Sequence, residues 1–159
     1  PGDNYNLVDS HVLPAFIRKF NDAKELSKKV VTCWGSGNPL REFMHVDDLA
    51  SACLFVLKYW DTFSNDCPLD EKNEPLLFLN VGSGNEISIK KLAKIIAFES
   101  GFEGDIKWDL SKPDGTPRKL LDIQKIRAIG WKSSIDLKEG IRRTINDYKK
   151  EIAEGTIRR

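Results

Sequence analysis

The sequence predicts an α/β domain with a small sheet, because segments of helical periodicity alternate with short apolar or β-branched runs. Two of these runs, 29–34 and 76–81, each stop at a Gly-Ser-Gly turn, which is typical of a strand that ends abruptly. Of the 159 residues, 40% are hydrophobic, which is enough for an ordinary core. We therefore expect one folded domain over residues 1–159.

The first helix is predicted from Pro14, since proline fits the first turn of a helix and apolar residues follow at helical spacing. A strand follows at 29–34 (KVVTCW), and a second helix is predicted over 46–60, where two aspartates in the first turn complement the helix dipole. The apolar face of that helix is predicted to comprise Val46, Leu49, Ala50, Cys53, Val56, Leu57 and Trp60.

Residues 61–75 lose all periodicity and collect turn formers, which predicts a mobile surface loop. The continuous apolar run at 76–81 (LLFLNV) predicts a strand covered on both faces. Ser88 is placed to cap a third helix, with Gly101 beyond its end.

A weaker strand is predicted at 106–108, and a short helix from 122 to 129 is closed by Gly130. The last helix is predicted after Asp136, which has capping-box spacing to Glu139. We expect the tail, residues 154–159, to fray.

Composition excludes several classes of protein. A net charge of +1 does not favour nucleic acid as a partner, and no apolar run approaches the ~20 residues that span a bilayer. Cys33, Cys53 and Cys67 lack the paired spacing of metal sites and disulfide frameworks, so we predict no metal and a reducing cytoplasm. Cys33 and Cys53 fall within predicted elements, where buried cysteine is the usual finding. The opening residues 1–4 indicate the middle of a longer protein.

Two motifs of complete reductases are absent from the sequence. No Gly-x-Gly-x-x-Gly follows a strand, and none of the three tyrosines begins a Tyr-x-x-x-Lys. A dinucleotide site therefore cannot be built by this chain alone, and a complete reductase is not encoded in it.

The run Arg41–Asp48 (REFMHVDD) is the first specific signal. It resembles the Arg-x-Phe-x-x-Val-x-Asp segment of extended short-chain dehydrogenases/reductases that act on nucleotide sugars. Further segments narrow the resemblance to the GDP-L-fucose synthase family, in family order: 9–15 (DSHVLPA), 34–37 (WGSG), 80–84 (NVGSG) and 111–122 (SKPDGTPRKLLD). The last of these is the most discriminating.

The resemblance implies the C-terminal, sugar-nucleotide-binding part of an enzyme that converts GDP-4-keto-6-deoxy-D-mannose to GDP-L-fucose. That conversion is an epimerisation at C3 and C5 followed by NADPH-dependent reduction at C4. The resemblance also implies that NADPH is bound mainly by an N-terminal Rossmann domain missing from this chain, and that the full-length protein is a homodimer. We expect the chain alone to be inactive.

His11 falls where the family places a catalytic histidine near the nicotinamide. An imidazole carries protons near neutral pH, as epimerisation requires. The family's partner for this histidine is a cysteine of the coenzyme-binding half, so the resemblance gives none of the three cysteines here that role. Without the resemblance, a histidine beside a helix start is more often a capping or packing residue.

Five residues occupy positions that the family uses around the GDP-sugar: Lys19, Trp34, Arg41, Asp114 and Lys119. The three cations suit a diphosphate, Trp34 offers an aromatic surface, and Asp114 can accept from ribose or guanine donors. Plainer interpretations stay open: a solvated Lys19, a core Trp34, an Arg41 paired with a carboxylate, and an Asp114 that only makes a turn.

Two other functions remain open at this point. The chain could be a stand-alone GDP-sugar-binding module without chemistry, or part of a related nucleotide-sugar epimerase or dehydratase. Nucleotide preference and the coding sequence upstream would separate these from the first prediction.

Overall fold

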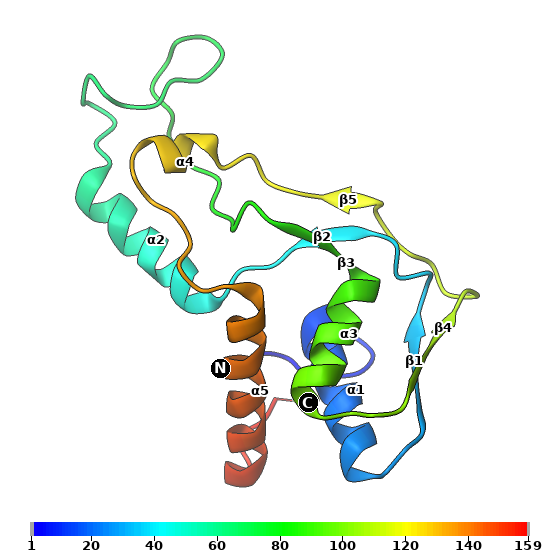
Figure 1. Cartoon of the computed structure of the whole chain (residues 1–159). Coiled ribbons are helices and arrows are strands. Elements are labelled where there is room, and N and C mark those ends of the chain that lie inside the picture. The colour runs from blue at the N-terminus through cyan, green and yellow to red at the C-terminus, as the bar shows by residue number, and fades with distance from the viewer. Residues whose placement is uncertain (1, 159) are drawn as a thin grey trace. The chain divides into compact units, whose positions relative to one another are not determined.

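The computed structural model describes residues 2–158 and confirms a small α/β fold; within that range it has five helices and five short strands (Figure 1). The elements run in the order α1 (Val12–Glu25), β1 (Val30–Trp34), β2 (Leu40–Glu42), α2 (Val46–Tyr59), β3 (Glu86–Ser88), α3 (Ile89–Ser100), β4 (Asp105–Asp109), β5 (Arg118–Lys119), α4 (Gln124–Ala128) and α5 (Leu137–Glu154).

The chain divides into two compact units. Unit 1 runs up to Arg41, from Ile87 to Arg118, and from Lys138 onward, whereas unit 2 comprises 42–86 and 119–137. A three-stranded sheet has the order β3-β2-β5, and each of its strands contains a boundary between the two units. That the chain acts as one sugar-nucleotide-binding domain stays a prediction.

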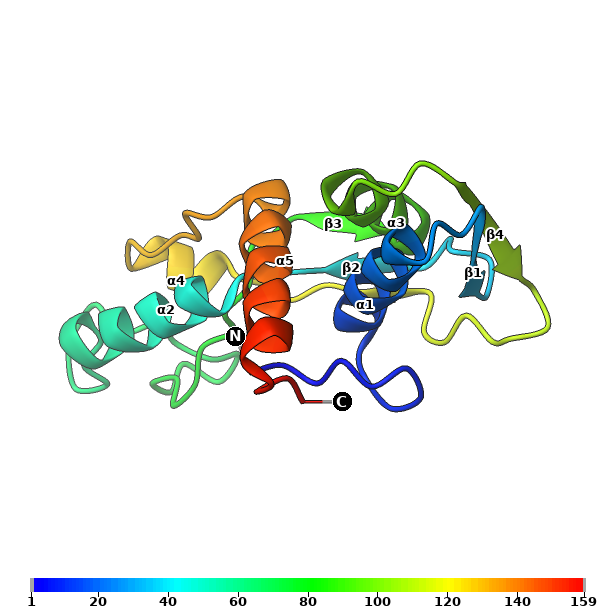
Figure 2. The same cartoon turned by 90° about the horizontal axis from the view of Figure 1, so that it is seen from below.

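Unit 1 is built on the parallel pair β1 and β4, with Val30 opposite Asp105 and Trp34 opposite Asp109. The helices α1 and α3 lie side by side next to these strands in both views (Figures 1 and 2). The helical spacing of apolar residues in α1 places one face in the core, as predicted. The largest buried apolar side chains of unit 1 are Tyr5, Phe16, Ile17, Phe20, Ile89, Leu92, Ile96, Phe102, Ile141, Ile145 and Tyr148.

The predicted caps of α3 are confirmed. The Ser88 hydroxyl accepts the backbone N–H of Lys91 at 3.2 Å, and Gly101 adopts the left-handed conformation that ends the helix. The described part of the tail, where fraying was expected, is hydrogen-bonded: the N–H of Tyr5 donates to the carbonyl of Arg158 at 3.0 Å. Arg159 lies outside the described residues.

Unit 2 has its own small core. Ala52 of α2 and Ile126 of α4 are fully buried, and Ile123 and Trp131 are buried beside them at 6% exposure each. The helix α2 is confirmed, but the prediction of its buried face is wrong: Leu57 is 83% exposed and Cys53 is also exposed. The helix is apolar on nearly every side, so the burial of Ala52 on one face leaves leucines on another.

The predicted strand at 76–81 is also wrong, since no residue of this run belongs to a described strand. Leu76 is buried, whereas Leu77 and Phe78 are 82% and 70% exposed. A strand needs a ladder of hydrogen bonds to a neighbour as well as apolar side chains. The N–H of Leu76 donates to the carbonyl of Pro68 at 2.9 Å, but the described part of the chain builds no such ladder along this run. The predicted loop 61–75 is a series of turns, and its mobility stays a prediction.

Candidate functional site

The candidate site lies at the carboxyl ends of the two parallel strands of unit 1. β1 ends at Trp34 and β4 ends at Asp109, and these residues are register partners. The backbone N–H of Gly35 donates to the carbonyl oxygen of Asp109 at 2.9 Å, which ties the two strand ends together. Ligands of open α/β sheets bind beyond the carboxyl ends of the strands. The residues that follow Trp34 and Asp109 are therefore the first candidates for a binding site.

Asp114 is fixed on the turn that follows β1. Its Oδ1 accepts the backbone N–H of Ser36 and its Oδ2 accepts the Ser36 hydroxyl, both at 2.6 Å. The hydroxyl and the N–H of Ser36 lower the pKa of the Asp114 carboxyl below its ordinary value. Asp114 is therefore charged at neutral pH. Two carboxylate oxygens offer about four acceptor sites, so Asp114 can still accept a hydrogen bond from a ligand.

Gly35 makes this close approach possible. Its φ is +76°, and a Cβ at this position would lie 2.3 Å from Oδ1 of Asp114. Any other residue would be strained in its backbone and would push the carboxylate away. The Gly-Ser-Gly turn after β1 is thus required to dock Asp114.

Trp34 presents an open aromatic surface at the end of β1, with 54% of the residue exposed. The Nζ of Lys19, on α1, lies 5.4 Å from the centroid of the Trp34 ring and donates to the carbonyl of Thr32 at 3.3 Å. Two residues predicted to bind substrate are therefore neighbours. Trp34 is a surface residue, as a stacking platform needs to be, and the core interpretation is excluded.

Arg41 reaches the turn that carries Asp114. Its Nη1 donates to the carbonyl of Leu40 at 2.7 Å, and its Nη2 lies 3.8 Å from the place where a Cβ would stand at Gly115. The structure thus brings four predicted residues to one region of unit 1 through consecutive contacts: Lys19, Trp34, Asp114 and Arg41.

His11 and Lys119 are both exposed. His11 occupies the N-cap position of α1, but its side chain makes no cap hydrogen bond, so the capping interpretation does not hold. Lys119 is the last residue of β5 and belongs to unit 2. The assignment of His11 to proton transfer and of Lys119 to substrate binding both stay predictions.

Glu42 is a polar residue that the sequence analysis missed. Its Oε1 accepts the backbone N–H of Gly84 at 2.5 Å, and its Oε2 accepts the N–H of Leu121 at 3.3 Å. A Cβ at Gly82 would lie 2.6 Å from Oε1. The glutamate therefore joins two distant segments of unit 2. Its position directly after Arg41 in the motif was the available signal.

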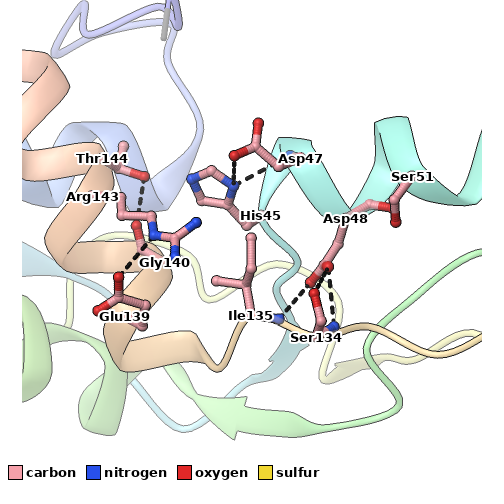
Figure 3. A network of polar contacts seen from close by, with 10 residues as sticks. All are labelled: His45, Asp47, Asp48, Ser51, Ser134, Ile135, Glu139, Gly140, Arg143 and Thr144. Atoms are coloured by element: carbon pink, nitrogen blue, oxygen red, sulfur yellow. Dashed lines mark hydrogen bonds and ion pairs between the residues drawn. The ribbon is translucent and has the colours of Figure 1, made fainter.

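Asp48, at the start of α2, also joins two segments that are distant in the sequence (Figure 3). Its side chain is buried. Its Oδ1 accepts the backbone N–H and the hydroxyl of Ser134, and its Oδ2 accepts the N–H of Ile135 at 3.0 Å. Nearby, Nδ1 of His45 accepts the N–H of Asp47 at 3.2 Å and caps the helix. The second aspartate of the REFMHVDD run thus has a structural role.

Unit 2 also contains two hollows, of about 360 and 350 Å³. The first is lined by residues from 83 to 85 and from 127 to 133, and the second by residues from 70 to 80 with Asp122 and Lys125. No predicted site residue lines either of them.

The described residues contain no group of three or more His, Cys, Asp or Glu side chains that could hold a metal ion. All three cysteines are free; Cys33 and Cys67 are buried. Over the part of the chain that the structure covers, no helix is both long and apolar enough to cross a membrane.

Comparisons with known proteins show which proteins this chain resembles. Residues 1–66 match the model of the NAD dependent epimerase/dehydratase family. Over 152 residues the chain is 44% identical to GDP-L-fucose synthase 1 of Arabidopsis thaliana, which is 96% of this chain and 43% of that protein. It is 41% identical over 144 residues to GDP-L-fucose synthase of Escherichia coli K12, with 91% of this chain and 44% of that protein covered.

A solved structure extends the likeness to the fold. The GDP-L-fucose synthetase from Naegleria fowleri bound to NADP superposes with a TM-score of 0.79 at 25% identity, covering 100% of this chain and 46% of that one. The chain thus spans less than half the length of each of these three proteins.

Proposed function

The chain belongs to the GDP-L-fucose synthases of the NAD dependent epimerase/dehydratase family, and we propose that it is the part of such an enzyme that binds the GDP-sugar. One observation carries the proposal: Trp34, Asp114 and Arg41 gather beyond the ends of β1 and β4. An aromatic face, a fixed carboxylate and a guanidinium are the groups that a base, a ribose and a diphosphate need. The whole enzyme then converts GDP-4-keto-6-deoxy-D-mannose to GDP-L-fucose.

Each group has a role in binding. The exposed face of Trp34 stacks on a planar ring or sugar. One N–H of the Arg41 guanidinium donates to the carbonyl of Leu40, and its four other N–H groups can donate to phosphate oxygens. Asp114 is held by Ser36 and accepts from a hydroxyl or an N–H of the ligand. Lys19, and Lys119 of β5, add positive charge for the diphosphate.

His11 is proposed to carry protons in the epimerisation at C3 and C5. Each epimerisation removes a proton next to the ketone and returns one to the opposite face, so an acid and a base are both needed. The imidazole of His11 is exposed and makes no hydrogen bond that caps α1, so it is available to a substrate. The family resemblance assigns its partner cysteine, and the nicotinamide near it, to the other half of the enzyme.

NADPH is proposed to bind mainly outside this chain, where it supplies the hydride for C4. The Gly-Ser-Gly turn at 82–84 does not fit a pyrophosphate, because the Glu42 carboxylate already takes the N–H of Gly84 and fills the space beside Gly82. A coenzyme-binding half would also cover the exposed leucines of α2 and the run 77–78. We further propose that the whole enzyme is a cytoplasmic homodimer; the three free cysteines support a reducing compartment.

Calorimetry with GDP, UDP and dTDP on the chain of 159 residues tests the proposal. GDP is expected to bind best, and both Trp34→Ala and Arg41→Ala to weaken it by about tenfold or more. Lys94→Gln, on the exposed face of α3, is a matched control that leaves binding unchanged. A preference for a pyrimidine nucleotide, or equal binding by Trp34→Ala and the control, would overturn it. NADPH oxidation with the keto sugar is expected to be undetectable for the chain alone.

A further inference from the structure

The arc from Asp109 to Asp114 is fastened at both ends to the turn after Trp34. At one end, the N–H of Gly35 donates to the carbonyl of Asp109 at 2.9 Å. At the other end, the N–H and hydroxyl of Ser36 donate to the carboxylate of Asp114. Within the arc, the N–H of Lys112 donates to the carbonyl of Asp109 at 3.2 Å. The backbone of Lys112 is therefore held in place beside the end of β1.

The side chain of Lys112 lies over the Trp34 ring, as that of Lys19 does. Its Nζ lies 5.4 Å from the centroid of Trp34, the distance also found for Lys19. Two ammonium groups thus share one exposed indole, although like charges repel. The aromatic face attracts each of them, but only weakly at an exposed site.

The carboxylates of the arc do not hold Lys112 tightly. The hydroxyl of Ser111 donates to Oδ1 of Asp109 at 2.6 Å and its N–H donates to the same oxygen at 3.0 Å. These bonds lower the pKa of the Asp109 carboxyl first, and the charge of Lys112 adds to the effect. Asp114 is occupied in the same way by Ser36. Positive charge is therefore left available next to an open aromatic face.

We propose that Lys112 is a further ligand-binding residue of this site, which leaves the Trp34 ring and contacts the diphosphate when the planar part of a nucleotide sugar stacks there. The inference rests on the proposed function and adds a residue to it. A ring that arrives on Trp34 displaces at least one ammonium group, and that group then lies beside an incoming anion. Because its backbone is fastened at 109 and 114, Lys112 makes this move by side-chain rotation alone.

If Lys112 contacts the diphosphate, its charge contributes to the binding of phosphate groups and not to the stacking of the base. Lys112→Gln removes the charge, so it is expected to lower the affinity for GDP by about tenfold. That is the cost of about one charge-assisted hydrogen bond. The same variant is expected to bind guanosine, which has no phosphate, as well as the unchanged chain does. Lys112→Arg keeps the charge and is expected to retain most of the affinity for GDP.

Calorimetry with GDP and guanosine, at two salt concentrations, tests this on the chain of 159 residues. Lys94→Gln removes the same charge from α3 and is the control, with an expected change below about twofold. The salt dependence of GDP binding is expected to fall in Lys112→Gln and not in the control. Equal GDP affinity in the two variants, or an equal loss for guanosine and GDP in Lys112→Gln, overturns the assignment of Lys112 while the proposed function stands. Failure of the unchanged chain to prefer GDP overturns both.

Discussion

Asp48 accepts both the backbone N–H and the hydroxyl of Ser134, at 3.0 and 2.9 Å. A third donor, the N–H of Ile135, reaches the other carboxylate oxygen. With Asp48 only 1% exposed, this carboxylate exchanges water for three protein donors and fixes α2 to the chain that precedes α5 (Figure 3).

Loss of that carboxylate is expected to destabilise the fold. Asp48→Ala leaves the N–H groups of Ser134 and Ile135 without their acceptor, so we expect the free energy of unfolding to fall by about 2–4 kcal/mol. Urea denaturation followed by circular dichroism measures it. Asp47→Ala, at an exposed position of the same helical turn, is the control, and we expect a change of about 0.5–1 kcal/mol. Equal losses in both variants would remove the special role of Asp48.

The same carboxylate gives stability a defined dependence on pH. Burial raises the pKa of Asp48, but the donors on Ser134 and Ile135, with His45, outweigh it and leave the pKa below its ordinary value. A lowered folded-state pKa stabilises the protein above the unfolded pKa of about 3.9, and this contribution is lost as pH falls through the folded value. The stability gap between the unchanged chain and Asp48→Asn is therefore expected to shrink as the pH falls below the unfolded pKa of about 3.9. A gap that is constant over this range would contradict the linkage.

Gly35→Ala is expected to damage both stability and ligand binding. The added Cβ would meet Oδ1 of Asp114 at 2.3 Å on a backbone with φ of +76°. Gly155 provides a control, since its φ is +68° but nothing lies within 4 Å of an added Cβ. We expect Gly155→Ala to cost about 1 kcal/mol from the backbone alone and Gly35→Ala more than that.

Gly35→Ala should weaken GDP binding and Gly155→Ala should not, because only Gly35 positions Asp114. Calorimetry measures the affinity and thermal denaturation the stability. If Gly155→Ala weakened GDP as much, the docking of Asp114 would not explain the effect.

The exposed apolar side chains of unit 2 are expected to drive self-association of the isolated chain. Leu57 and Leu77 are each more than four-fifths exposed, and large apolar side chains left in water favour association. Sedimentation velocity at increasing concentration should show it, and Leu57→Lys should reduce it. Val8→Lys, at an equally exposed single position of unit 1, is the control and should have no effect. A monomeric chain at all concentrations would show that these side chains are tolerated in water.

The helices were predictable because each has local causes within its own sequence. Ser88 and Gly101 mark both ends of α3, and the spacing from Phe16 to Ala23 gives α1 one buried face. The strand predicted at 76–81 was wrong because apolar residues indicate burial but not which segment covers them. The prediction of the buried face of α2 was wrong for a related reason. A helix that is apolar on most sides gives no signal for which side packs against the core.

The site was predictable from motifs and not from periodicity. The motif resemblance indicated Trp34, Arg41 and Asp114, and the structure places them near one another. It did not assign a role to Ser36, Glu42 or Lys112. Across long sequence separations, these residues contact a carboxylate, backbone N–H groups and a ring face, respectively. Such contacts leave no spacing rule in a sequence.

The glycine-rich turn at 82–84 already has two charged partners within unit 2: the Glu42 carboxylate accepts the N–H of Gly84, and Nη2 of Arg127 donates to the carbonyl of Ser83 at 3.1 Å. The amide of Gly84, which could otherwise hold an anion, therefore already donates to a protein carboxylate. A motif search that counts glycines would mistake this turn for a phosphate loop.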